Sequence, residues 1–143
     1  MYDNVKDALR ESVKSGPVEF LLFPDEIATL ILDTENIEGE KLEQAIAIAQ
    51  QTVLALQNKR EFLLDAIADE FLKEYNEICH PDKPESKEQF LDKIYLDMVI
   101  IGVETATVFI YYIPKDLDNF FGDHAIAVML SSDLQVEFVE MVG

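Results

Sequence analysis

Residues 107–113 read Thr-Val-Phe-Ile-Tyr-Tyr-Ile, and this stretch decides the fold class. Its β-branched and aromatic residues favour the extended backbone of a strand. Residues 98–101, just before it, have the same character. Two further apolar runs, at 125–130 and 134–141, flank a short polar break that is typical of an antiparallel hairpin. The last third of the chain is therefore predicted to form a four-stranded meander.

A second pair of apolar runs lies near the N-terminus, at residues 18–23 and 27–32. Residues 24–26, Pro-Asp-Glu, separate them, and proline and aspartate favour a turn. We therefore predict an N-terminal β-hairpin. Residues 1–15 before it are expected to be either a helix or a mobile arm.

Between these two regions the apolar residues recur every three or four positions, which places them on one face of a helix. One such stripe covers residues 42–56, and a second covers residues 63–78. Two prolines then predict a loop over residues 80–85. Ser86 and Gln89 form a capping-box pattern, which predicts that a short helix begins there.

Helices in the middle of the chain and strands at both ends predict an α+β fold. We expect one antiparallel sheet, made of the N-terminal hairpin and the C-terminal meander, with the central helices packed on one face. The chain has 143 residues, of which 49% are hydrophobic, and this suits one domain with its own core. Residues 1–143 are therefore predicted to form a single domain.

The chain carries 29 acidic and 11 basic residues, a formal net charge of -18. Such a charge repels phosphate backbones and anionic lipid, so neither direct nucleic-acid binding nor membrane binding is expected. A single cysteine allows no internal disulfide, and the N-terminal sequence lacks the pattern of a signal peptide. The cytoplasm is therefore the predicted compartment.

The sequence has only two histidines, His80 and His124. Glu77 and His80 have the spacing of a di-iron motif, and Cys79 with His80 offers two zinc ligands, but the di-iron site needs a second copy and zinc needs four ligands. We predict no metal and no cofactor. Cys79 is expected to pack as a small hydrophobe, and His80 to cap carbonyls at the end of a helix.

Residues 116–119, Asp-Leu-Asp-Asn, resemble the opening of a calcium loop. Phe120 and Phe121 occupy the positions where such a loop needs a ligand and a glycine, so an acidic loop between two strands is predicted instead. Asp123 and His124 are adjacent, and adjacent side chains of a strand point to opposite faces. That pair therefore does not predict a catalytic dyad.

From Asp97 to the C-terminus there are eight carboxylates and a single base, Lys115. Solubility accounts for charge of this kind, and recognition of a basic partner is the sharper alternative. We predict a surface that contacts a basic protein. Its predicted residues are the acids Asp116, Asp118 and Asp123 and the adjacent His124. The aromatic residues Tyr111, Tyr112, Phe120 and Phe121 are predicted to serve as its anchors if they are exposed. The structural alternative for His124 is packing beside the neighbouring phenylalanines.

Three motifs follow one another in the second half of the chain. They read Leu72-x-x-x-Asn76, then Pro84-x-Ser86-x-x-Gln89-Phe90, then Leu117-x-x-Phe120-Phe121-x-x-His124-x-Ile126-x-Val128, and the chain closes at Gly143. This order resembles a bacterial family of small domains of unknown function, in which a Phe-x-Gly-His-x-Ile-x-Val motif follows an aromatic-rich strand. The chain departs from that motif at Asp123, where the family has glycine. The resemblance covers about half the chain and implies a fold type and a surface, but no reaction.

Small acidic bacterial proteins include immunity proteins that neutralise toxins. This chain is similar to them only as a member of the same broad class of small acidic proteins. We therefore expect a non-enzymatic, acidic protein-binding module. One alternative is a small hydrolase or metal-dependent enzyme that uses His124 with a distant carboxylate such as Glu70 or Glu74. Another alternative is a homo-oligomer that pairs exposed strand edges, with residues 134–141 as the edge.

Overall fold

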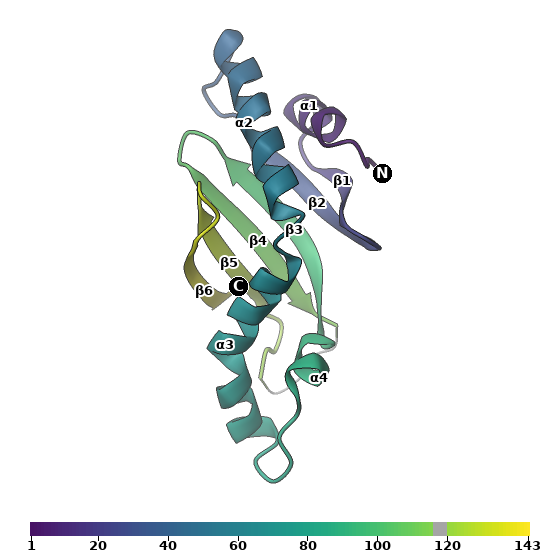
Figure 1. Ribbon diagram of the computed structural model, residues 1–143, viewed down its shortest axis with the longest axis vertical. Helices are drawn as coiled ribbons and strands as arrows, with labels where there is room; N and C mark the ends of the chain where they lie inside the picture. The colour runs from purple at the N-terminus through teal and green to yellow at the C-terminus, as the bar shows by residue number, and fades with distance from the viewer. Residues whose placement is uncertain (116–119) are drawn as a thin grey trace.

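The computed structural model describes residues 1–115 and 120–143, and Figure 1 shows the order of the elements. The helices are α1 (Val5–Ser15), α2 (Glu40–Leu56), α3 (Arg60–Cys79) and α4 (Lys87–Leu91). The strands are β1 (Val18–Phe23), β2 (Glu26–Asp33), β3 (Ile94–Gly102), β4 (Thr107–Pro114), β5 (Ala125–Ser131) and β6 (Val136–Val142). These elements confirm the predicted α+β class.

The described strands form one six-stranded sheet in the order β1-β2-β3-β4-β5-β6. β1 pairs antiparallel with β2, and each of β3 to β6 pairs antiparallel with the next. β2 and β3 run parallel, so the sheet is mostly antiparallel rather than wholly antiparallel as predicted. The physical reason is the connection, because α2, α3 and α4 lie between these two strands and carry the chain back to the same end of the sheet.

The N-terminal residues form a helix, α1, rather than a mobile arm. The Asn4 side chain caps it by accepting a hydrogen bond from the backbone N–H of Asp7 at 3.0 Å. Leu9 is fully buried in the core. The buried Ser12 hydroxyl accepts a hydrogen bond from the Leu32 N–H at 3.0 Å, which ties α1 to β2.

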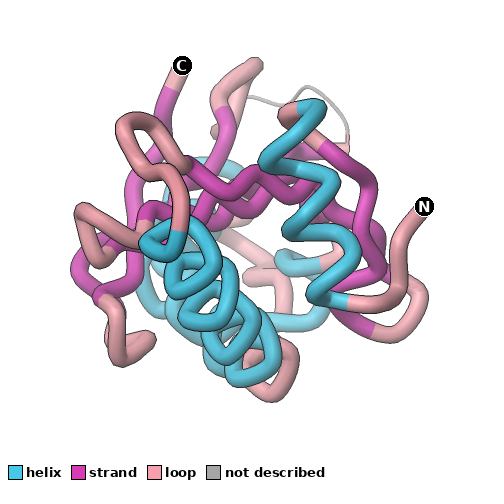
Figure 2. The backbone as a smooth tube through the Cα atoms, turned by 90° about the horizontal axis from the view of Figure 1, so that it is seen from above, coloured by secondary structure: helices cyan, strands magenta, loops and turns pink. Residues whose placement is uncertain are grey.

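The helices α2 and α3 cross in front of the sheet in Figure 1, and the strands curve around the helices in Figure 2.

The predicted capping box is confirmed at the start of α4. There Ser86 Oγ accepts from the Gln89 N–H at 3.2 Å, and the Gln89 side chain accepts from the Ser86 N–H at 2.8 Å. No helix among the described residues is both long enough and apolar enough to cross a membrane.

The core lies on one face of the sheet. Along β4, Val108, Ile110 and Tyr112 are buried, whereas the residues between them keep partial exposure. This alternation follows from strand geometry, which sends successive side chains to opposite faces. We call the face that carries Ile110 the inner face and the face that carries Tyr111 the outer face.

Candidate protein-interaction surface

The aromatic residues predicted as contact anchors do not share one surface. Tyr112 is 2% exposed and Phe121 is 0% exposed, and both belong to the hydrophobic core. Their predicted role as anchors required exposure, so neither ring can serve as an anchor, because other apolar side chains enclose both. Phe120 is half-buried and packs edge-on against Phe71 of α3, with ring centroids 6.1 Å apart. It helps to hold the chain against that helix.

The polar residues predicted for the same surface are only partly described. Asp116 and Asp118 lie outside the described residues. Asp123 and His124 are exposed just before β5, and the His124 N–H donates a hydrogen bond to the Phe121 carbonyl at 3.1 Å. Within residues 1–115 and 120–143, no carboxylate forms an ion pair with the His124 ring.

Tyr111 is the predicted anchor that lies on the outer face, and it has apolar neighbours there. Every second residue along a strand lies on the outer face. The outer-face residues with large apolar side chains include Ile31 of β2, Met98 and Ile100 of β3, Phe109, Tyr111 and Ile113 of β4, Met129 of β5 and Phe138 of β6. Each of these side chains is partly exposed, and none belongs to the core or packs against it. We call this set the outer apolar patch. Open antiparallel sheets usually present polar side chains on this face, so the patch calls for a functional explanation.

Three rings at the centre of the outer apolar patch contact one another. The Phe109 and Tyr111 rings stack at 6.2 Å with an interplanar angle of 14°. Phe138 of the neighbouring region of the sheet meets Phe109 edge-on at 6.3 Å and 62°. Contacts of this kind fix the orientation of the rings, so the patch is a preformed surface rather than a set of independent side chains. Large, ordered aromatic side chains are the residues that dominate protein interfaces.

The charges of the sheet are all of one sign. The described strands carry the carboxylates Glu19, Glu26, Asp33, Asp97, Glu137 and Glu140, and none of the eleven lysines and arginines lies in them. Glu26 forms an ion pair with Arg60 of α3. Glu19, Asp33 and Glu140 are exposed and form no ion pair with a described base. The outer apolar patch therefore lies within a negative field.

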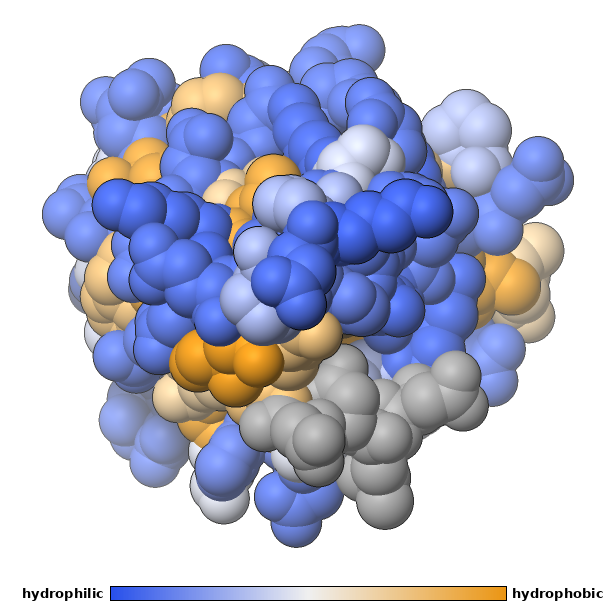
Figure 3. Space-filling model, turned by 90° about the horizontal axis from the view of Figure 1, so that it is seen from below, coloured by the Kyte–Doolittle hydropathy of each residue, from blue (hydrophilic) through white to orange (hydrophobic). Residues whose placement is uncertain are grey.

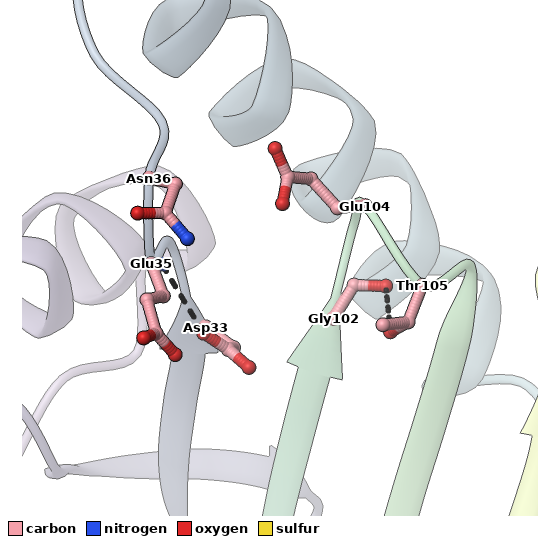
Figure 4. A pocket seen from close by; sticks show the side chains of 6 residues that line it. All are labelled: Asp33, Glu35, Asn36, Gly102, Glu104 and Thr105. Atoms are coloured by element: carbon pink, nitrogen blue, oxygen red, sulfur yellow. Dashed lines mark hydrogen bonds between the residues drawn. The ribbon is translucent and has the colours of Figure 1, made fainter.

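An acidic pocket lies where β2 and β3 end (Figure 4), and its volume is about 140 Å³. Its lining residues are Asp33, Glu35, Asn36, Gly102, Glu104 and Thr105. The Asp33 carboxylate accepts a hydrogen bond from the Glu35 N–H at 3.2 Å. Glu104 lines the opposite side of the pocket, on the turn after β3. The described residues contain no group of three or more ligands that are placed to hold a metal ion. The pocket extends the acidic margin of the outer face.

A second polar cluster joins the end of α3 to the loop that follows it. Tyr75 Oη donates to Glu85 Oε1 at 2.8 Å, and His80 Nε2 lies 2.6 Å from the same oxygen. The Asn76 side chain bonds both the N–H and the carbonyl of Glu85, at 2.9 and 3.1 Å. His80 ends α3 as expected, because its backbone N–H donates to the Asn76 carbonyl at 2.9 Å, and its ring in addition pairs with the Glu85 side chain. Hydrogen bonds to both the side chain and the backbone of Glu85 thus hold the loop that follows α3. Seen from below, the surface of the molecule is largely hydrophilic (Figure 3).

A buried hydroxyl on the inner face has no hydrogen-bond partner among the described residues. It is Tyr112 Oη, in the wall of a pocket of about 230 Å³ that Arg60 and Glu26 also line. Burial raises the pKa of Tyr112 above its ordinary value, and the nearby Glu26 charge adds to the shift, so the hydroxyl stays protonated. The Arg60 guanidinium is already engaged with Glu26 and Glu61.

Most residues of the outer apolar patch are not predicted from the sequence as a binding surface, although the sequence carries a signal for them. Residues 107–113 and 98–101 are apolar at both alternating sets of positions, whereas a half-buried strand alternates apolar with polar residues. Apolar residues at both alternating sets of positions indicate that both faces of the strand are covered. The described structure covers the set that contains Ile110, and the set that contains Tyr111 stays accessible.

Comparisons with protein-family models, with curated proteins and with solved structures give no match to this chain. The resemblance of the C-terminal motifs to a bacterial family of small domains therefore stays a prediction.

Proposed function

We propose that this chain is a non-enzymatic, acidic protein-binding module of the bacterial cytoplasm, similar in class to immunity proteins, and that the outer apolar patch is its binding surface. The observation that carries the proposal is the patch itself, because Tyr111, Phe109 and Phe138 are ordered, apolar and accessible on an unusually apolar sheet face. Soluble proteins seldom expose a contiguous apolar surface unless it binds something. No comparable convergence of nucleophile, base and oxyanion donors supports an enzyme among the described residues.

We also propose that the N-terminal hairpin and the C-terminal meander join edge to edge and that the helices pack on one face of the sheet. In this arrangement the helices supply the apolar partners that the inner face needs. Among residues 1–115 and 120–143 no such partner covers the outer face, so the fold that buries Ile110 leaves Tyr111 partly exposed for a partner.

Site-specific crosslinking in cells tests the proposal. A photoreactive phenylalanine analogue replaces Tyr111 or Phe138 on the patch, and in a control it replaces Ile48, which is 53% exposed on α2. We expect a discrete crosslinked adduct of fixed mass from both patch positions and none from position 48. Equal adducts at all three positions, or none at either patch position, would contradict the proposal.

The homo-oligomer alternative rests on β6, which forms one edge of the sheet. Its exposed Glu137 and Glu140 and the bulge at its pairing with β5 are features that discourage edge-to-edge pairing. At the other edge, Tyr2 already bonds β1, through its N–H to the Glu19 carbonyl and its own carbonyl to the Leu21 N–H, both at 2.9 Å. Sedimentation equilibrium distinguishes this alternative, since edge pairing gives a mass that rises with concentration.

A further inference from the structure

We infer that the partner of the outer apolar patch presents an apolar centre flanked by lysine or arginine side chains; this inference rests on the proposed function and names the chemistry of the partner. The reason is the pairing register of the sheet. One row of paired outer-face residues crosses every described strand, in the order Glu19, Thr29, Met98, Tyr111, Ala127, Glu140. Both ends of the row are exposed carboxylates, and its middle is apolar.

The next row of the outer face is wholly apolar. It runs through Ile31, Ile100, Phe109, Met129 and Phe138. The row beyond it begins at Asp33, which pairs with Gly102 and lies in the acidic pocket of Figure 4. Carboxylates thus stand at both sides and at one end of the patch. A partner with cations at matching positions gains attraction at the rim without burying an unpaired charge at the centre.

The register also sets the scale of the partner. Neighbouring strands lie about 4.8 Å apart, so the five steps from β1 to β6 place Glu19 and Glu140 about 24 Å apart along the sheet. A helix rises about 1.5 Å per residue, so about 16 residues span that distance. A single helix with an apolar stripe and basic ends, or a folded surface of similar width, fits these dimensions.

A second copy of the chain fits this surface poorly. Two copies stacked face to face about a twofold axis that runs along this row, or across it at its centre, place the Glu19 and Glu140 carboxylates of one row against the same carboxylates of the other. Each copy also brings a net charge of -18. Anionic lipid meets the same repulsion. The sign of the rim therefore selects a cationic protein surface over both alternatives.

The test uses three defined 18-residue helical peptides and the full chain. The first peptide has a leucine face flanked by lysines, the second has the same leucine face flanked by glutamates, and the third keeps the lysines but has serine in place of leucine. Binding is measured by fluorescence anisotropy at low and at high salt. The patch variant is Tyr111→Thr, with Ile48→Thr on α2 as its control. The rim variant combines Glu19→Gln and Glu140→Gln, with Glu70→Gln and Glu74→Gln on α3 as its control.

We expect the leucine–lysine peptide to bind most tightly and to weaken as salt rises. The rim variant should weaken it by about fivefold, as expected for two exposed charge pairs. Tyr111→Thr should weaken it by about tenfold or more. Both control variants should bind as the wild type does, and circular dichroism should show that all variants keep their fold.

The outcomes separate the inference from the proposed function. Equal binding of the lysine-flanked and glutamate-flanked peptides, or no effect of the rim variant, overturns the basic partner but leaves the patch as a binding surface. Equal binding of the leucine and serine peptides, with no effect of Tyr111→Thr, overturns both. A stable dimer at all salt concentrations that Tyr111→Thr dissociates also overturns the basic partner, because the second copy then occupies the patch.

Discussion

Tyr111 and Tyr112 are neighbours in the chain and have opposite surroundings. Tyr112 points to the inner face, where its ring is buried, and its hydroxyl finds no partner among the described residues. Tyr111 points to the outer face, where it stacks on Phe109 and stays partly exposed. The same residue type is therefore buried at one position and accessible at the next, where we propose that it contacts a partner. Along β4 both faces of the sheet carry apolar side chains, and they differ in what covers them.

The largest expected difference between the faces is in packing. Replacing Ile110 by alanine removes a fully buried side chain from the core, which should lower the free energy of unfolding by about 3 kcal/mol. Replacing Ile100 by alanine should lower the free energy of unfolding by less than about 1.5 kcal/mol, because Ile100 is partly exposed on the outer face. Urea denaturation of the two variants measures the difference. Equal losses would mean that the outer face is as well packed as the core.

A second prediction concerns the attachment of α1 to the inner side of β2. Ser12→Ala leaves the Leu32 N–H without its buried acceptor, so the free energy of unfolding should fall by about 1 to 3 kcal/mol. Ser15→Ala is the matched control, because the Ser15 hydroxyl bonds only the exposed Glu11 side chain in the same helix. If the two variants lose the same stability, the Ser12 bond does not hold α1 to the sheet.

How much of the fold can be predicted from the sequence depends on how far apart in the chain the interacting residues lie. β1 spans Val18–Phe23, as predicted, because its turn signal lies within the next three residues. β3 was expected to begin at Met98 and begins at Ile94, since Tyr95 pairs with Ile113 across the sheet. Such pairing joins residues far apart in the chain and leaves no local pattern. The parallel pairing of β2 with β3 is missed for the same reason.

The candidate surface was predictable only in part. An acidic surface with aromatic anchors was expected, and of the four rings Tyr111 lies on the outer apolar patch. Phe109 and Phe138 were missed, because an apolar strand residue is usually assigned to the core. Which of two apolar faces a helix covers is decided by the whole chain. The sequence can therefore indicate that both faces are apolar, but it does not indicate which one stays accessible.

The smallest expected effect comes from the two tyrosine hydroxyls. Tyr112→Phe removes a buried hydroxyl that has no described partner, so stability at neutral pH should stay the same or rise by up to about 1 kcal/mol. Tyr111→Phe, its neighbour on the outer face, is the matched control and should change little. A clear loss of stability in Tyr112→Phe would show that the hydroxyl is satisfied by a bound group.

The same variant has a pH signature. Burial raises the pKa of Tyr112 above the ordinary value of 10.0, so above about pH 10 the unfolded chain releases this proton while the folded chain retains it. The unfolded state is then favoured, and stability should fall as the pH rises. Tyr112→Phe should fall less steeply than the wild type between pH 9 and about pH 11, as urea denaturation at each pH would show. Parallel curves would contradict the burial of the hydroxyl.

The most direct test of the difference between the two faces is the solvent accessibility of individual methyl groups. Methyl-labelled isoleucine and methionine are observed by NMR while a soluble, uncharged paramagnetic agent is added to the free protein. We predict strong relaxation of Ile100, Met98 and Met129 on the outer face, and little change for Ile110 and Ile126 on the inner face. Equal protection of both sets would contradict it, because some part of the chain or a second copy would then cover the outer apolar patch.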